Sequence, residues 1–147
     1  MPSEQQPDRK QNNMLSKFRE KRGGFTLVEI MIVVAIIALL AAIAVPGFLR
    51  ARKRSQASRV INDLRLIDSA VDQYAIENNK ATGAVVNTAD WSIYMKKGSA
   101  LYNTAQDLFG NDYGVQTVDS LPKVPANTWN TLSDVADTAF FSPYSHY

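Results

Sequence analysis

Few residues of this chain have side chains suited to chemistry, and one of them stands in an unusual place. The chain has no cysteine and a single histidine, His146, beside its C-terminus. Thiolate catalysis, cysteine metal sites and histidine-based triads therefore lack their components. The remaining candidate is Glu29, an acid inside the apolar run 25–45. An acidic residue at the centre of a bilayer costs about 2.5–3.5 kcal/mol, so Glu29 needs a partner.

A basic partner for Glu29 must be created by cleavage or supplied by another chain. No lysine, arginine or histidine occurs between Phe25 and Leu49. Cleavage between Gly24 and Phe25 would create an α-amino group four residues before Glu29, about 6 Å away along a helix. We expect the two charges to pair, within one chain or between axially shifted chains. In a helical array, such a pair would fix the axial register, because a missed pairing leaves a charge in an apolar core.

The run that positions Glu29 is long enough to cross a membrane. Residues 25–45 are 21 in number, and only Thr26 and Glu29 among them are polar. As a helix they would span about 31 Å, which matches a hydrocarbon core of about 30 Å. A buried helix of a soluble domain is the poorer alternative, since the rest of the chain is too short to wrap it. We predict a transmembrane helix over 25–46.

The segment before this helix is a basic leader, residues 1–24. Its first 13 residues are polar, contain two prolines and show no apolar periodicity, which indicates disorder. Of the 16 basic residues in the chain, six lie in this leader, so the net charge of +2 is largely a property of the N-terminus. Met1 and Met14 are both plausible translation starts, and the sequence does not choose between them.

The helical pattern resumes after a predicted kink at Pro46 and Gly47, where proline removes a backbone N–H. The segment 47–80 is expected to continue as an amphipathic helix, ending near 78–80. Its apolar stripe is Ala57, Val60, Leu64, Ile67, Val71 and Tyr74. The stripe could pack against the rest of this chain or against partner helices. We favour packing within the chain, because residues 81–147 need an apolar surface on which to fold.

Residues 81–147 predict a small α+β region. A short helix is expected from Asn87 or Thr88 to Gly98, a strand over 113–119, and a turn capped by Ser133 or Thr131. The aromatic residues Phe140, Phe141 and Tyr144 are expected in the core. The fold class is thus α+β: a long N-terminal helix packed by a small antiparallel sheet. No nucleophile and base occur at motif spacing, so we do not expect an enzyme.

The stretch KRGGFTLVE, residues 21–29, followed by an apolar run with a late proline, resembles the N-terminal signature of type IV pilins and type II secretion pseudopilins. The resemblance implies a pilin-like fold. It implies that a prepilin peptidase cuts between Gly24 and Phe25 and methylates the nitrogen of Phe25. It also implies that Glu29 serves in assembly.

A second stretch, DLFGNDYG at 107–114, is similar to a motif of the major pseudopilin. Asp107, Gly110, Asn111 and Tyr113 agree with that motif, and an ordinary turn between strands explains much of the match. The family also binds calcium in a C-terminal loop. The nearest candidates here are Ser133, Asp134 and Asp137, for which a capping role is the favoured reading.

These observations lead to one hypothesis with two alternatives. The chain is expected to be a structural subunit of a type IV-like filament, most similar to the major pseudopilin of a type II secretion system. The first alternative is a type IV pilin for adhesion, motility or DNA uptake. The second is a single-span membrane-anchored binding protein. The chain has no nucleotide-binding loop, so an external motor must drive assembly.

The resemblance also implies partners and a location. The expected partners are copies of the chain, minor pilins or pseudopilins, prepilin peptidase, an inner-membrane assembly platform and the lipid bilayer, whereas nothing requires nucleic acid. The chain is expected in the bacterial inner membrane, with a cytoplasmic N-terminus and a periplasmic or extracellular C-terminal region. Basic residues flank both ends of the span, so the positive-inside rule does not decide the orientation. A secretory signal peptide cut at 42–44 is a poor alternative, because the apolar run is too long and contains an acid.

Overall fold

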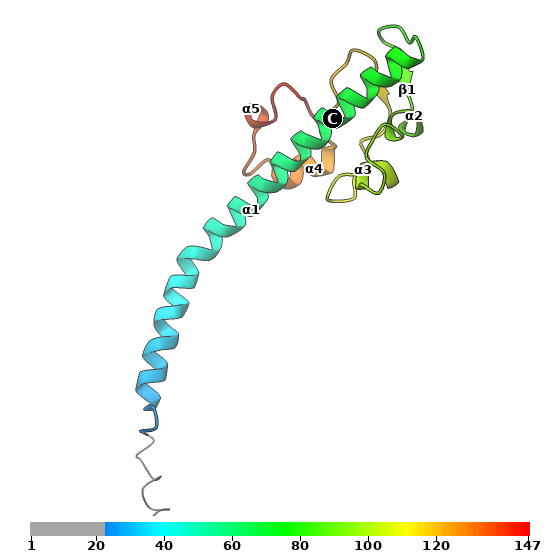
Figure 1. Ribbon diagram of the computed structural model, residues 1–147. Coiled ribbons are helices and arrows are strands. Elements are labelled where there is room, and N and C mark those ends of the chain that lie inside the picture. The colour runs from blue at the N-terminus through cyan, green and yellow to red at the C-terminus, as the bar shows by residue number, and fades with distance from the viewer. Residues whose placement is uncertain (1–22) are drawn as a thin grey trace, which may run out of the picture. The chain divides into compact units, whose positions relative to one another are not determined.

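The computed structural model describes residues 23–147 (Figure 1). The predictions of a disordered start and of two translation starts lie outside the described residues, as does the predicted leader 1–24 up to residue 22. Internal contacts divide the chain into two units, Met1–Ile43 and Ala44–Tyr147.

One helix, α1, runs from Leu27 to Glu77 and is 51 residues long. Its apolar part in the first unit leaves every large hydrophobic side chain exposed, from Leu27 at 77% to Ile43 at 73%. By length and composition, α1 is the one helix in the described part of the chain that could cross a membrane. The helix includes Pro46. The kink expected at Pro46 and Gly47 stays a prediction.

The end of α1 agrees with the predicted stop. Asn79 has a φ of 48°, the left-handed conformation that Asn tolerates better than most residues. The N–H of Lys80 then donates to the carbonyl of Ala75 at 2.9 Å. This bond satisfies a helix-end carbonyl that has no donor within the helix, so the chain leaves α1 without a buried orphan group.

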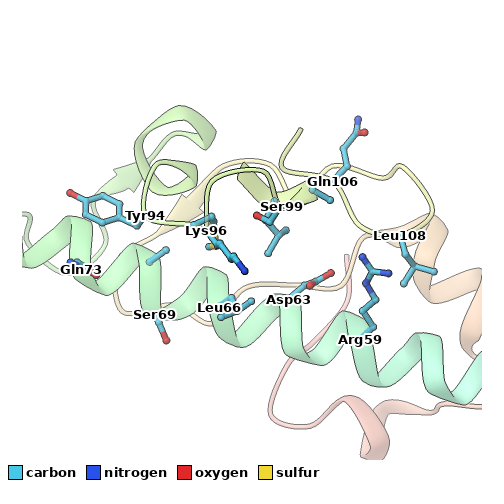
Figure 2. Close-up of a pocket in the computed structure, with 14 residues that line it drawn as sticks. Arg59, Asp63, Leu66, Ser69, Gln73, Tyr94, Lys96, Ser99, Gln106 and Leu108 are labelled. Atoms are coloured by element: carbon cyan, nitrogen blue, oxygen red, sulfur yellow. The ribbon is translucent and has the colours of Figure 1, made fainter. Parts of the chain in front are cut away.

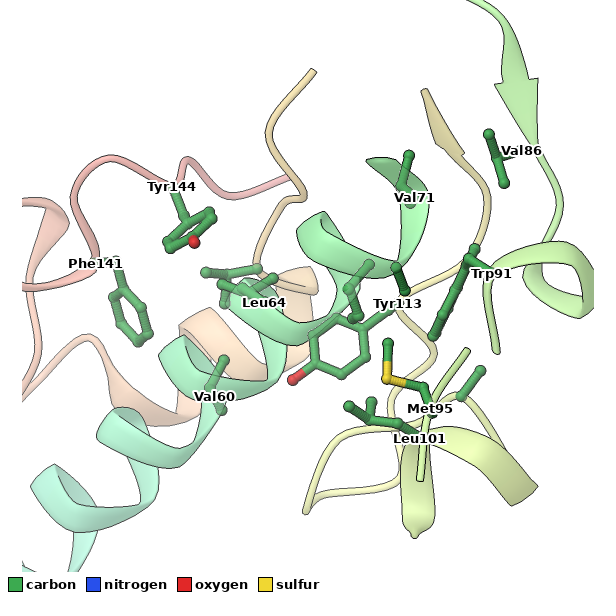
Figure 3. Packing of buried hydrophobic residues seen from close by; sticks show 14 of the residues in the cluster. Val60, Leu64, Val71, Val86, Trp91, Met95, Leu101, Tyr113, Phe141 and Tyr144 are labelled. Atoms are coloured by element: carbon green, nitrogen blue, oxygen red, sulfur yellow. The ribbon is translucent and has the colours of Figure 1, made fainter. Parts of the chain in front are cut away.

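The core of the second unit lies on one face of α1 (Figure 3). Ala57, Val60, Leu64, Ile67 and Val71 of the predicted stripe are buried, and Tyr74 is partly buried. The residues that cover this face come from the rest of the same chain; the largest are Trp91, Tyr113, Phe141, Leu132 and Val124. The prediction that the stripe packs within its own chain is confirmed.

The remaining elements are short. Strands β1 (Val85–Val86) and β2 (Gln116–Thr117) form a two-stranded antiparallel sheet in which Val85 pairs with Thr117. Helices α2 (Thr88–Ser92) and α3 (Ala100–Asn103) lie between the strands in sequence, and α4 (Ala126–Leu132) and α5 (Thr138–Phe141) follow them. The α+β class, the long helix and the small antiparallel sheet are confirmed.

The predicted helix after Asn87 is present but shorter than expected. The carboxylate of Asp90 accepts hydrogen bonds from the backbone N–H and the side-chain amide of Asn87, at 3.1 and 3.2 Å. This contact fixes the first turn of α2. The helix ends at Ser92 rather than at Gly98, because separate turns follow it.

The prediction that Ser133 or Thr131 caps the last turn is wrong. Thr131 lies inside α4, where its hydroxyl donates to the carbonyl of Asn127 at 2.8 Å, and Ser133 ends that helix. The cap of α5 is Asp137, whose carboxylate accepts the N–H of Phe140 at 2.9 Å. Pro125 is the N-cap residue of α4, which begins at Ala126, and this places Thr131 in the helix body. Of the three aromatics expected in the core, Phe141 and Tyr144 are buried and Phe140 is partly buried.

Candidate functional site

Glu29 and Thr26 cap the N-terminus of α1 through reciprocal hydrogen bonds. The backbone N–H of Thr26 donates to Glu29 Oε2 at 2.7 Å, and its hydroxyl donates to the same oxygen at 2.9 Å. In return, the N–H of Glu29 donates to Thr26 Oγ1 at 3.2 Å. Thr26 and Glu29 stand three residues apart at the start of the helix, so they form a capping box.

This capping box changes how the acid in the apolar run is interpreted. Two donors from Thr26 satisfy the carboxylate within its own chain, and the first turn of a helix also favours a negative charge. Glu29 therefore has a local partner before any cleavage. Both donors reach Oε2, so an amino group arriving near Glu29 would find its charge already partly satisfied by Thr26.

The residues expected at the cleavage point precede the helix. Gly23 and Gly24 are exposed and lie outside regular structure. A Cβ added at Gly24 would meet no atom within 4 Å. Packing in the chain itself thus gives no reason for glycine at this position. A requirement for a small residue would have to come from a partner that binds this segment.

The loop that resembles a pseudopilin motif is built around a buried carboxylate. Asp107 is 5% exposed, and its Oδ1 accepts the backbone N–H groups of Phe109 and Asn111 at 2.8 and 2.9 Å. Its Oδ2 accepts the hydroxyl of Thr128 from α4. Gly110, which lies between Phe109 and Asn111, has a φ of 81°, a backbone conformation that residues with a side chain rarely adopt. Three of the four matching motif residues thus belong to one turn.

Two further bonds tie this loop to helices. The amide of Asn111 donates to Thr128 Oγ1 at 2.9 Å. Tyr113, the fourth matching residue, is buried, and its hydroxyl donates to Asp63 on α1 at 3.3 Å. Burial raises the pKa of the Asp63 carboxyl, which the nearby Arg59 and the Tyr113 bond only partly offset. The loop works as a structural joint between α1 and α4. The sequence predicted the turn but not this network.

The three calcium candidates lie together but already have partners. Ser133, Asp134 and Asp137 line a hollow of about 260 Å³. Asp134 forms an ion pair with Lys53 at 2.8 Å, which lowers the pKa of its carboxyl, and Asp137 caps α5. The guanidinium of Arg54 lines the same hollow and would repel a cation. This arrangement supports the capping role for Asp137. Calcium binding stays a prediction from the family resemblance.

A groove of about 340 Å³ runs between α1 and the segment that follows α2 (Figure 2). Its α1 wall includes Arg59, Asp63 and Leu66, and Lys96 and Leu108 lie across from them. Among residues 23–147 no three His, Cys, Asp or Glu side chains are placed to hold a metal ion. The groove offers mixed charges over an apolar floor.

Comparison with known proteins agrees with these features. Residues 19–45 match the family described as the prokaryotic N-terminal methylation motif. The chain is 25% identical over 115 residues to the type II secretion system core protein G of Aeromonas hydrophila, which covers 72% of this chain and 80% of that relative. The same core protein of Klebsiella pneumoniae is 27% identical over 103 residues, 64% of this chain and 74% of that relative.

Two pilins are more similar over a shorter stretch. The type IV major pilin protein PilA of Myxococcus xanthus is 41% identical over 66 residues, 45% of this chain and 30% of the pilin. The type IV major fimbrial protein FimA of Dichelobacter nodosus is 38% identical over 76 residues, 52% of this chain and 48% of that protein. The alignments thus span less than half of either pilin. No solved structure matches the chain.

The family found by these comparisons explains the unusual N-terminal half of the chain. The matched motif covers both glycines, Glu29 and the exposed apolar part of α1. The relatives are named as type IV pilins or as the core protein of a type II secretion system. The motif, the exposed helix and the relatives together show that the chain carries the N-terminal methylation motif and is similar to type IV pilins and to type II secretion core proteins.

Proposed function

We propose that this chain is the precursor of a structural subunit of a type IV-like filament, resembling the major pseudopilin of a type II secretion system. The methylation motif over residues 19–45 carries this proposal, since it spans the expected cut and the membrane helix. The pseudopilin assignment draws on relatives named core protein G, which align over 80% and 74% of their own length.

Processing would define the mature subunit. In this proposal residues 1–24 are a leader, 25–46 the membrane and filament-core helix, 47–80 its amphipathic continuation, and 81–147 the globular region. A prepilin peptidase cuts between Gly24 and Phe25 and methylates the new amine. The exposed, irregular backbone at Gly24 supports this, because a peptidase needs an extended segment that nothing covers.

Assembly would then exchange the partner of Glu29. In the uncut chain, Thr26 satisfies the carboxylate. In a filament, the amine of Phe25, from the same subunit or from a neighbour, takes that place as a charged partner. A salt bridge in an apolar core is favourable only with good geometry, so the exchange selects one axial position of neighbouring helices. The apolar face exposed on α1 supplies the contact area between subunits.

The proposed location follows from the same elements. The subunit is stored in the inner membrane with its leader in the cytoplasm and its globular region in the periplasm or outside the cell. Its partners are copies of itself, minor pilins or pseudopilins, the peptidase and an assembly platform. The driving motor is external.

The cleavage is tested by replacing Gly24. Gly24→Val should leave uncut precursor in the membrane, whereas Gly23→Ala, one residue earlier, should be cut. Mass spectrometry of the N-terminus reads the outcome: a mature chain that starts at methylated Phe25 supports the proposal. A chain that starts at Val45 would indicate a signal peptide and overturn it.

The role of Glu29 is tested by two replacements. Glu29→Gln keeps an oxygen that can accept from Thr26 but removes the charge, and Glu29→Ala removes both. If the charge sets the register, both variants are cut normally and both assemble poorly, as measured by sheared filament yield. If Glu29→Gln assembles as well as the wild type, the capping box alone is needed and the charge pair is refuted.

A type IV pilin is the second candidate. It is favoured by the higher identity to PilA and FimA, 41% and 38%, although this lies over shorter alignments. Deleting the gene separates the two: loss of exoprotein secretion with normal surface motility indicates a pseudopilin. Loss of motility, adhesion or DNA uptake with normal secretion indicates a pilin.

A further inference from the structure

A basic surface follows directly after the apolar run of α1. Arg50, Arg52, Lys53, Arg54 and Arg59 lie within ten residues of helix, and the four arginines among them are exposed. No acid occurs in α1 between Glu29 and Asp63. We call these five residues the juxtamembrane cluster. The motif and the proposed filament role do not account for it.

The end of the chain packs onto this cluster. Asp134 bonds to Lys53 at 2.8 Å, and the ring of Phe140 lies under the guanidinium of Arg54, 5.3 Å from it. Asp134 and Asp137 are the acids that line the hollow beside Arg54. They offset two of the five positive charges. The surface formed by the cluster and residues 133–141 therefore remains positive, and it includes an aromatic ring.

The position of the cluster along the helix sets its distance from the hydrocarbon. Arg50 lies five residues after Val45, the last residue of the apolar run, which is at most about 8 Å of helix, and Arg54 lies about 14 Å after it. The polar layer of a bilayer is about 5–8 Å thick on each side. Long basic side chains also reach back toward it. Phe48 lies between Val45 and Arg50 and is 69% exposed. Aromatic rings are common at the membrane–water interface.

We propose that the juxtamembrane cluster and residues 133–141 form a docking surface for anionic phospholipid headgroups. Arg50 and Arg52 contact lipid phosphates, while Lys53 and Arg54 hold Asp134 and Phe140 and so bring the C-terminal segment to the same level. The inference goes beyond the filament role, because it requires only that α1 is in a membrane. Lipid is the partner that fits, since the arginines lie within a few residues of the hydrocarbon.

The test uses energy transfer from the full chain in nanodiscs that hold one copy each. The chain has no cysteine, so Ala139→Cys gives a single labelling site in α5. The bilayer mixes phosphatidylcholine with phosphatidylglycerol, and the acceptor dye is placed on the headgroup of one lipid or the other. We expect roughly two- to five-fold stronger enrichment of the anionic lipid around the probe. High salt should reduce this enrichment, because it screens exposed charges.

Variants decide the outcome. Arg50→Gln with Arg52→Gln should abolish the preference, and Lys96→Gln with Lys97→Gln, which removes the same charge beyond α2, should keep it. A probe at Ala81→Cys, after the end of α1, should show less transfer than the one at 139. Equal transfer to both lipids, or a preference unchanged by the arginine replacements, would overturn the proposal. So would a preference that arises only with two copies in each disc, because it would indicate contact between subunits. Loss of processing or assembly leaves this test intact, so the two proposals fail separately.

Discussion

Thr128 in α4 donates its hydroxyl to the buried carboxylate of Asp107, and this bond joins the loop before β2 to the helix that follows β2. The other oxygen of Asp107 accepts two backbone N–H groups, from Phe109 and Asn111. The carboxylate is thus fully engaged in a site that excludes most water. The three donors together compensate for the burial of the Asp107 carboxylate. Removing any one of them leaves a buried oxygen with too few hydrogen bonds.

Removing the Thr128 hydroxyl should therefore destabilise the globular region. Thr128→Val keeps the volume but leaves Oδ2 of Asp107 without this donor, and we expect a loss of about 1–3 kcal/mol. Thermal unfolding of the full chain in detergent, followed by near-ultraviolet circular dichroism, measures it. The matched control is Thr131→Val in the same helix, where the hydroxyl is exposed and the effect should stay within about 0.5 kcal/mol. Equal losses for both variants would contradict the role of the network.

Gly110 should resist replacement by a residue with a side chain. Its φ of 81° lies in the left-handed region, so Gly110→Ala should cost about 1–2 kcal/mol even though an added Cβ would meet no atom within 4 Å. Gly47 also has open space around it but lies within α1, where alanine is the better helix former. Gly47→Ala should not lower the melting temperature. A drop for Gly47→Ala, or none for Gly110→Ala, would show that backbone conformation is not the cause.

Asp63 should make stability depend on pH in an unusual direction. Burial raises the pKa of its carboxyl in the folded chain, so the unfolded chain loses this proton first as pH rises. Between the unfolded and folded pKa the native state holds more protons, and stability falls with rising pH. Asp63→Asn removes this penalty and should raise the melting temperature at pH 7 relative to wild type.

The gain from Asp63→Asn should shrink below the ordinary pKa of aspartate, about 3.9, where both states are protonated. Melting curves at several pH values check this, with Asp72→Asn, an exposed residue of the same helix, as the control. A gain for Asp63→Asn that is the same at all pH values would point to packing rather than to charge.

Thr26 should matter for the uncut subunit in the membrane. Thr26→Val removes the hydroxyl that donates to Glu29 and caps α1, and Thr26→Ser keeps it. We expect Thr26→Val to shorten the half-life of membrane-bound precursor and to lower filament yield, and Thr26→Ser to retain both. Pulse-chase labelling of membranes separates the two variants. If Thr26→Val behaves as wild type, the capping box does not stabilise Glu29 in lipid.

The long helix could be predicted from the sequence because its signals are repeated over many residues. The apolar run is longer than a soluble core needs, and the stripe from Ala57 to Tyr74 recurs at helical spacing. The short elements carry too few residues for such signals. Strands of two residues have no measurable alternation, and α4 is set by Pro125 together with burial of Leu132. Tertiary packing decides these segments.

The sequence predicted some features of the candidate site and missed others. Glu29 could be found because an acid in an apolar run is rare, whereas its bond to Thr26 was not predicted. The pattern Thr-x-x-Glu at 26–29 is a capping-box signal and could have predicted the bond. The Asp107 network joins residues up to 21 positions apart. Such contacts depend on how the loop and α4 meet, which no local pattern specifies.

The burial of one face of α1 by its own chain has a consequence for quality control. Before the globular region folds, α1 exposes two apolar surfaces, the apolar run in its first half and the stripe from Ala57 to Ala75. Folding buries the stripe and leaves only the apolar run for contact with other subunits. An immature subunit would thus expose an extra adhesive face, through which it could stall or misjoin a growing fibre. Folding of the globular region would therefore have to precede correct assembly.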